Sequence, residues 1–270
     1  MHLCQPDGTK SCGACCGLYN WQDHSRKTLH ALLQRRTSLF FSSGQEKKSP
    51  PPCQAAGAPA ANPPLLETIH NCEYLGFMDR YQSRVGCLLH PSLHQGRDLR
   101  GKSFYGEELC AEHLCPSYTH LTEIEQSAVI HSLQDWYLYG LAITDIDLVK
   151  EFLGHVQNRL GDCLRGERLK DFGVQMALRE FFQLKESWKF ASSPNRLGKY
   201  SFSHAEYQIA RIEYERGWGT KPSPFDKILV SLSSEIQSRR DLSEAESIIE
   251  ARIEKFIEAY LITQGPSFRA

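Results

Sequence analysis

The chain has 270 residues, of which 31 are Lys or Arg and 32 are Asp or Glu, so its formal net charge is −1. This balance argues against a nucleic-acid-binding protein that works by bulk neutralisation of phosphates. The chain contains no run of about 18 apolar residues, which a membrane span would require. It also does not begin with the basic residues and apolar core of a secretory signal. We therefore expect a cytoplasmic protein without nucleic-acid or membrane partners.

The most unusual feature of the composition is its ten cysteines, nine of which lie in residues 1–120. In a reducing cytoplasm, cysteines in such numbers indicate metal ligands or redox groups more readily than disulfides. We expect a mainly α fold in two parts. Residues 1–120 would form an irregular, cysteine-rich metal-binding module, packed with an α-helical region over residues 121–270.

The first 120 residues contain few regular elements. One short helix is expected over residues 24–41, because leucines and a phenylalanine recur there at helical spacing. Residues 43–64 are rich in proline and alanine, which predicts an exposed, flexible insertion rather than a continuous helix. Residues 70–118 have many turn signals and weak periodicity. A bound metal could supply their ordering free energy, which is roughly 10–16 kcal/mol for structural zinc peptides.

Residues 121–262 carry helical apolar patterns throughout. Thr122 and Glu125 form a capping box before the first helix, and Ser243 is expected to begin the last one in the same way. Gly161 is expected to end the second helix. The six expected helices cover residues 122–139, 146–160, 174–188, 207–214, 225–236 and 243–260.

The strongest chemical signal is the segment Cys12-Gly-Ala-Cys15-Cys16-Gly17. Two thiolates in a C-x2-C turn come close enough to hold one metal, and the glycines permit the backbone reversal that this needs. Adjacent side chains such as those of Cys15 and Cys16 usually diverge, so both seldom bind one tetrahedral ion. The doublet therefore predicts a cluster, two nearby metals, or one cysteine that only packs.

More cysteines downstream complete the set of candidate ligands. The candidate metal ligands are Cys12, Cys15, Cys16, Cys72, Cys87, Cys110 and Cys115. One tetrahedral site uses four ligands, so two sites or one larger cluster are possible. The surplus of thiolates and the adjacent pair favour an iron–sulfur cluster, with zinc as the alternative. Cys4, His90 and His113 stay open as ligands, Cys53 in the insertion is not expected to bind, and Cys163 is expected to be a buried packing residue.

Three segments of this region resemble a known family. They are the Cys12-x2-Cys15-Cys16 start, Cys72-Glu-Tyr-Leu75, and Gly86-Cys87-Leu-Leu-His90-Pro91. They resemble the YkgJ-type cysteine-cluster proteins, the CxxCxxCC proteins that chelate zinc or iron. The resemblance covers roughly residues 10–118. It implies cysteine-bound zinc or an iron–sulfur cluster, with no settled reaction for most members.

The sequence departs from that family pattern in two places. Thr9 stands where the pattern begins with a cysteine, and His90-Pro91 stands where many members have an Arg-Pro pair and soon afterwards another cysteine. Three functions stay open. The first is a metal-binding module with a structural, redox or metal-handling role. The second is a cluster-dependent modifying enzyme, since flagellin lysine-N-methylase is similar in its cysteine segment. The third is a helical protein that binds a protein partner and keeps a structural metal.

Overall fold

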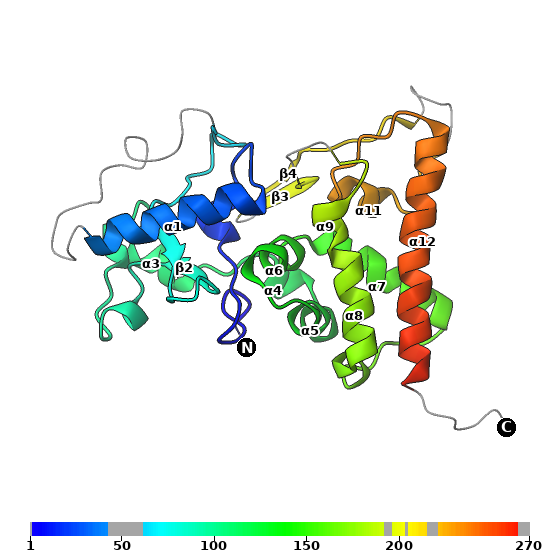
Figure 1. Ribbon diagram of the computed structural model, residues 1–270, viewed down its shortest axis with the longest axis horizontal. Coiled ribbons are helices and arrows are strands. Elements are labelled where there is room, and N and C mark those ends of the chain that lie inside the picture. Colours follow the sequence, from blue (N-terminus) through cyan, green and yellow to red (C-terminus); the bar gives the residue numbers. More distant parts are fainter. Residues whose placement is uncertain (1, 43–61, 192–195, 203–204, 215–220, 264–270) are drawn as a thin grey trace. The chain divides into compact units, whose positions relative to one another are not determined.

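The computed structural model describes residues 2–42, 62–191, 196–202, 205–214 and 221–263, so most of the expected insertion at 43–64, with Cys53, lies outside the described residues. Helices predominate in the described part, and its strands form two antiparallel pairs (Figure 1), which confirms the mainly α class. The chain divides into two compact units. Unit 1 is Met1–Cys115 with Asp135–Gly140, and unit 2 is Pro116–Gln134 with Leu141–Ala270. The expected division lay at residue 120.

Unit 1 is built around one helix and one short hairpin. The long α1 packs against the hairpin (Figure 1), in which Leu75 pairs with Cys87 and Phe77 with Val85. Three short helical turns follow and carry the chain to Cys115. The elements of unit 1 are η1 (Ala14–Cys16), α1 (Arg26–Ser42), β1 (Leu75–Phe77), β2 (Val85–Cys87), η2 (Pro91–Leu93), η3 (Arg100–Lys102) and α3 (Gly106–Glu112).

The segment Asp135–Gly140, which includes the start of α6 (Trp136–Ile143), adds aromatic side chains to unit 1. The Tyr137 hydroxyl donates a hydrogen bond of 2.9 Å to the carbonyl of His24, and the Tyr139 hydroxyl donates one of 2.7 Å to the carbonyl of Leu3. Both tyrosines are buried. Because a buried hydroxyl without a partner is costly, these bonds fix the chain near residues 3 and 24 to a segment more than a hundred positions away.

Unit 2 is a layer of helices around an aromatic core. Phe152 stacks on Phe181 at 3.8 Å between ring centres, and Phe256 meets Phe152 edge to face at 5.8 Å. These three rings come from α7, α8 and α12, and the last two run side by side (Figure 1). The elements of unit 2 are α4 (Ser117–His120), α5 (Glu123–Ser132), α7 (Ile146–Leu160), η4 (Arg168–Lys170), α8 (Phe172–Phe182), α9 (Leu184–Ser187), β3 (Lys199–Phe202), β4 (Ala205–Gln208), α11 (Asp226–Ser231) and α12 (Arg239–Ile262).

Several predicted helices are confirmed with different ends. The capping box of Thr122 is present, but its helix α5 ends at Ser132 and a separate α6 follows. Gly161 ends α7 with the left-handed φ of 66° that glycine adopts without strain. The predicted third helix is divided between α8 and α9, and the fifth is the shorter α11.

Two predictions in this region are wrong. Tyr207 and Gln208, which begin the expected helix 207–214, lie in strand β4 and pair with β3. The apolar spacing of Tyr207, Ala210 and Tyr214 fits a helix, but the partner strand supplies the backbone hydrogen bonds that decide the outcome. The last helix α12 begins at Arg239 with Ser238 as its cap, so Ser243 lies inside the helix.

We expect Thr122→Ala to lower the free energy of unfolding by about 1 kcal/mol, because it removes one of the two bonds of the capping box. In that box the Thr122 hydroxyl accepts from the Glu125 amide, and the Glu125 carboxylate accepts from the Thr122 amide. Urea unfolding followed by circular dichroism measures the change. The control is Ser247→Ala on the exposed face of α12, where the hydroxyl only donates to Ser243 in its own helix. Equal losses in both variants would contradict the cap's contribution.

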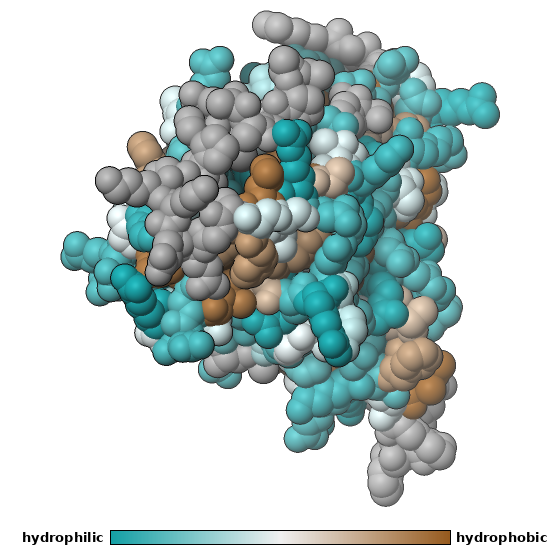
Figure 2. Space-filling model, turned by 60° about the vertical axis from the view of Figure 1, so that its left-hand side comes forward, coloured by the Kyte–Doolittle hydropathy of each residue, from teal (hydrophilic) through white to brown (hydrophobic). Residues whose placement is uncertain are grey.

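Hydrophilic residues cover most of the face shown in Figure 2, and hydrophobic residues form limited areas on it. Basic and acidic residues are nearly equal in number over the whole chain. Among the described residues, no helix combines the length and the apolar character that crossing a bilayer requires.

Candidate metal centre

Eight of the nine described cysteines lie in unit 1, and the electrostatic interactions between their thiols divide them into two sets of four, with Cys4 acting on members of both. The first set comprises Cys4, Cys12, Cys15 and Cys115. The backbone amide of Cys12 donates to the carbonyl of Cys4 at 2.8 Å, which places the N-terminal segment beside the C-x2-C turn. A hydrogen bond with Cys115, then burial, then the thiols of Cys12 and Cys4 raise the pKa of Cys15 well above its usual value. Burial and the same neighbours, Cys4 and Cys115, raise the pKa of Cys12.

The loop that joins Cys4 to Cys12 is held by an ion pair. Lys10 is 2% exposed, and its Nζ donates to Asp7 at 2.5 Å. Burial alone would raise the pKa of Asp7, but hydrogen bonds from Lys10 and Thr9 outweigh it and lower this pKa to about 2. The charged pair therefore persists at neutral pH and fixes the turn that brings Cys4 back to Cys12.

The second set comprises Cys16, Cys72, Cys87 and Cys110. The amide of Cys72 donates to the carbonyl of Cys16 at 2.9 Å, and Cys87 is the last residue of β2. Burial comes first in raising the pKa of Cys16 well above its usual value, followed by the thiols of the other three members and, last, by Cys4. The thiols of the second set therefore interact electrostatically with Cys16, and Cys4 of the first set acts on Cys16 as well.

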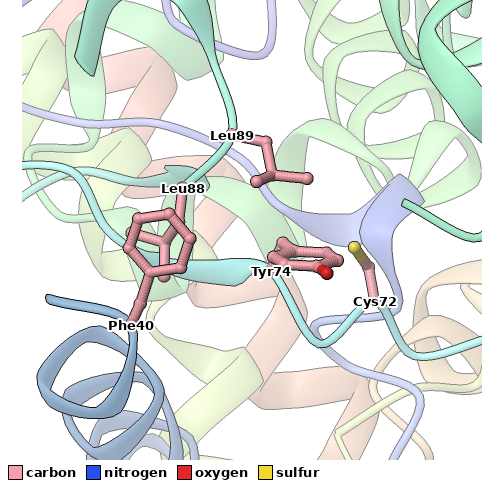
Figure 3. Packing of buried hydrophobic residues seen from close by; sticks show 5 residues of the cluster. All are labelled: Phe40, Cys72, Tyr74, Leu88 and Leu89. Atoms are coloured by element: carbon pink, nitrogen blue, oxygen red, sulfur yellow. The ribbon is translucent and has the colours of Figure 1, made fainter. Parts of the chain in front are cut away.

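Hydrophobic packing positions part of this second set. Figure 3 shows Tyr74 between Cys72 on one side and Phe40 and Leu88 on the other. Cys16 and Cys87 pack against the same buried cluster. The pKa of Cys72 rises to about 12 and that of Cys87 to about 11, in both cases mainly through burial.

The adjacent pair Cys15 and Cys16 is divided between the two sets. Both residues lie in η1, and successive side chains of a 3-10 helix point about 120° apart, because this helix has 3.0 residues per turn. Gly17 ends the turn with a φ of 80°, and a Cβ on it would lie 2.6 Å from the Asn71 side chain and 2.8 Å from the Asn71 backbone. A left-handed conformation and a close approach together require glycine there. The expected backbone reversal is thus present, and it belongs to Gly17.

Two arginines and a serine lie beside the second set. Arg36 of α1 donates from Nη1 to the carbonyl of Cys72 at 3.0 Å, and Arg100 donates to the carbonyl of Cys110 at 3.2 Å. The Ser103 hydroxyl lies 3.3 Å from the sulfur of Cys110. Each cation lowers the pKa of one thiol, Arg36 that of Cys72 and Arg100 that of Cys87, against the larger effect of burial. In the first set, the pKa values of Cys12 and Cys15 are shifted by neighbouring thiols and by burial, and that of Cys12 also by a backbone amide.

The thiols with raised pKa values are neutral at physiological pH, so they do not fit the role of a thiolate nucleophile, which requires a lowered pKa. A metal ion changes this, because it binds thiolates and displaces their protons. Four thiols per set is the number that structural Zn²⁺ takes and the number that holds one iron–sulfur cluster. As the side chains stand, no three His, Cys, Asp or Glu residues of the described part are arranged to hold a metal ion. Ligation would therefore require the thiols of each set to rotate towards a common point.

The other candidates lie in different surroundings. The His90 side chain accepts from the Ser92 amide and caps η2, a local role that needs no metal. His113 is the residue that ends α3. Cys163 is exposed in unit 2, so the expectation that it is a buried packing residue is wrong. It follows the left-handed Gly161 at the end of α7, in a segment where residues 161–163 are all exposed.

Sequence reasoning left Cys4 open and did not assign the cysteines to sets. The spacing from Cys4 to Cys12 matches no common ligand pattern. The signal that could have drawn attention to it is the turn-forming segment Pro6-Asp7-Gly8, which returns the chain towards Cys12.

A search of family models, curated proteins and solved structures finds no match to this chain. The similarity to the CxxCxxCC proteins therefore rests on the motif residues alone and stays a prediction.

Proposed function

We propose that unit 1 binds two metal centres, each held by the four cysteines of one set, as zinc ions or as iron–sulfur clusters. The observation that carries this proposal is that eight cysteines spread over residues 4–115 interact as two groups of four, with backbone hydrogen bonds that join Cys4 to Cys12 and Cys16 to Cys72. Ordering and burying so many thiols in a region with little regular structure costs free energy. Metal binding by each set would offset that cost.

The division of the doublet changes the balance between zinc and iron. The sequence favoured a cluster because more than four thiolates, two of them adjacent, would crowd one zinc ion. With Cys15 in one set and Cys16 in the other, no thiolate is in surplus and each set matches either metal. A reducing, cytoplasmic location belongs to the same proposal. The interpretations as a modifying enzyme or a partner-binding protein stay predictions.

The test is a measurement of bound metal after purification without air. We expect either about two zinc ions per chain or iron with an equal amount of acid-labile sulfide and a brown visible spectrum. Cys163→Ser is the matched control, since this thiol is exposed and lies in unit 2. Cys53→Ser, or a shortened segment 44–62, is expected to keep the metal as well. A protein that holds neither metal, even after anaerobic reconstitution with each, would contradict the proposal.

A further inference from the structure

An arginine lies in the middle of the apolar face with which α1 packs in unit 1. The buried residues of α1 are Leu29, Leu33, Arg36 and Phe40, at the spacing of one helix face. Arg36 is only 6% exposed, although a guanidinium keeps its charge at any physiological pH. Burial of a permanent charge is costly unless a partner compensates it.

The guanidinium of Arg36 uses only part of its hydrogen-bonding capacity. Nη1 donates to the carbonyl of Cys72, and the Trp21 ring centre lies 5.8 Å from Cζ. Nε and Nη2 are buried and have no hydrogen-bond partner. These two nitrogens form the fork with which arginine donates two parallel bonds to an anion. Among the ion pairs of the described residues, none supplies Arg36 with a carboxylate.

The second set is a source of negative charge at this place. The carbonyl of Cys72 accepts a hydrogen bond from Arg36. The positive charge of Arg36 also interacts with the Cys72 thiol and lowers its pKa against the larger effect of burial. A metal site of four thiolates carries a net negative charge, because four thiolates outweigh one Zn²⁺. Side chains outside the ligand set commonly donate hydrogen bonds to the metal ligands. Removal of such a side chain typically lowers metal affinity by about 10–100-fold.

We propose that Arg36 is the counter-ion of the second set and that its Nε–Nη2 fork donates hydrogen bonds to the thiolates of that set when they hold a metal. This inference rests on the proposed function. Arg36 is a positioning residue, since it acts on the metal through the thiolates. The charge of Arg36 is then uncompensated in the metal-free protein, which it destabilises. In the metal-bound protein the thiolates compensate the charge, and Arg36 stabilises that state.

The experiment uses the full chain, stripped of metal and titrated with zinc against a chromophoric chelator. For Arg36→Met we expect the first set to bind zinc as in the parent protein and the second set to bind about 10–100-fold more weakly. We expect Arg36→Met to raise the melting temperature of the zinc-free protein and to lower that of the zinc-loaded protein. Arg36→Lys keeps a charge and should recover part of the affinity, whereas Arg36→Gln should not. Arg252→Met is the control, because Arg252 also has a buried Nε without a partner but lies in unit 2 and pairs with Glu180.

Two results would overturn the counter-ion role while leaving the two-metal proposal intact. One is equal zinc affinity of both sets in Arg36→Met and in the parent. The other is an equal fall of the melting temperature with and without zinc, which is the result of lost packing alone. If Arg36→Met does not fold, equal zinc affinities of Arg36→Lys and Arg36→Gln overturn the inference instead. A parent protein that binds no zinc and no iron–sulfur cluster overturns both proposals.

Discussion

Cys15→Ser and Cys16→Ser are each expected to remove one metal centre from a protein that holds two, and the two variants should lose different centres. The reason is that the two thiols belong to different sets although they are neighbours in the chain. Loss of one centre forfeits a large part of the ordering free energy of unit 1, since structural zinc contributes roughly 10–16 kcal/mol in small domains. Metal analysis and the absorption spectrum of the cobalt-substituted protein measure the loss.

Double variants show whether the sets are separate. Cys15→Ser with Cys115→Ser lies within the first set and should lose no more metal than either single variant. Cys15→Ser with Cys72→Ser crosses the sets and should lose both centres. Cys163→Ser should lose none. A single variant that empties both centres would instead indicate one larger cluster that all eight cysteines share.

The second large effect is expected in unit 2, where Lys185→Met or Asp145→Asn should lower the free energy of unfolding by about 3–5 kcal/mol each. The Lys185 side chain is fully buried. It donates to the Asp145 carboxylate, to the carbonyl of Ser231 at 2.7 Å and to that of Arg196 at 3.4 Å. Asp145 also accepts from the Ser231 hydroxyl and from the Leu148 amide at the start of α7. Each single change leaves the other charge buried without its partner.

Urea unfolding followed by far-ultraviolet circular dichroism measures these losses, because unit 2 contains most of the described helix. The double variant Lys185→Met with Asp145→Asn should lose less than the sum of the single variants, since neither stranded charge then remains. Lys255→Met is the control, because Lys255 and Glu180 form a solvent-exposed pair whose loss costs about 1 kcal/mol or less. Single-variant losses as small as that of the control would contradict the proposed importance of the buried pair.

Most helices were readable from the sequence, but their ends were readable only at some of the positions that local interactions decide. The capping box of Thr122 and the stop at Gly161 are both present, because each depends on residues within one turn. The Asp145 side chain accepts from the Leu148 amide at the start of α7, and it also pairs with Lys185, a second contact that the sequence does not reveal. Strand β4 was missed because its partner β3 decides it, and apolar spacing alone does not reveal a partner strand.

The candidate site was likewise only partly predictable from the sequence. The concentration of cysteines predicted that they converge, but their assignment to sets depends on side-chain direction and on the path of the chain. Cys15 and Cys16 are separated by the tight turn of η1, and Cys4 reaches Cys12 through a loop held by Lys10. The buried Arg36 was unreadable as well, because an arginine in an amphipathic helix is usually assigned to the solvent face.

The hydrogen bond from Tyr139 to the carbonyl of Leu3 sets an order of events during synthesis of the chain. All four cysteines of the second set have been made once residue 110 is complete, together with the α1 helix that contacts them. The first set also needs Cys115, and the Leu3 carbonyl next to Cys4 gains its hydrogen bond only after Tyr139 has been made. Because chains fold from the N-terminus as they emerge, the second set can receive its metal earlier on a nascent chain than the first set, whose N-terminal segment is tied to a residue that follows the start of unit 2.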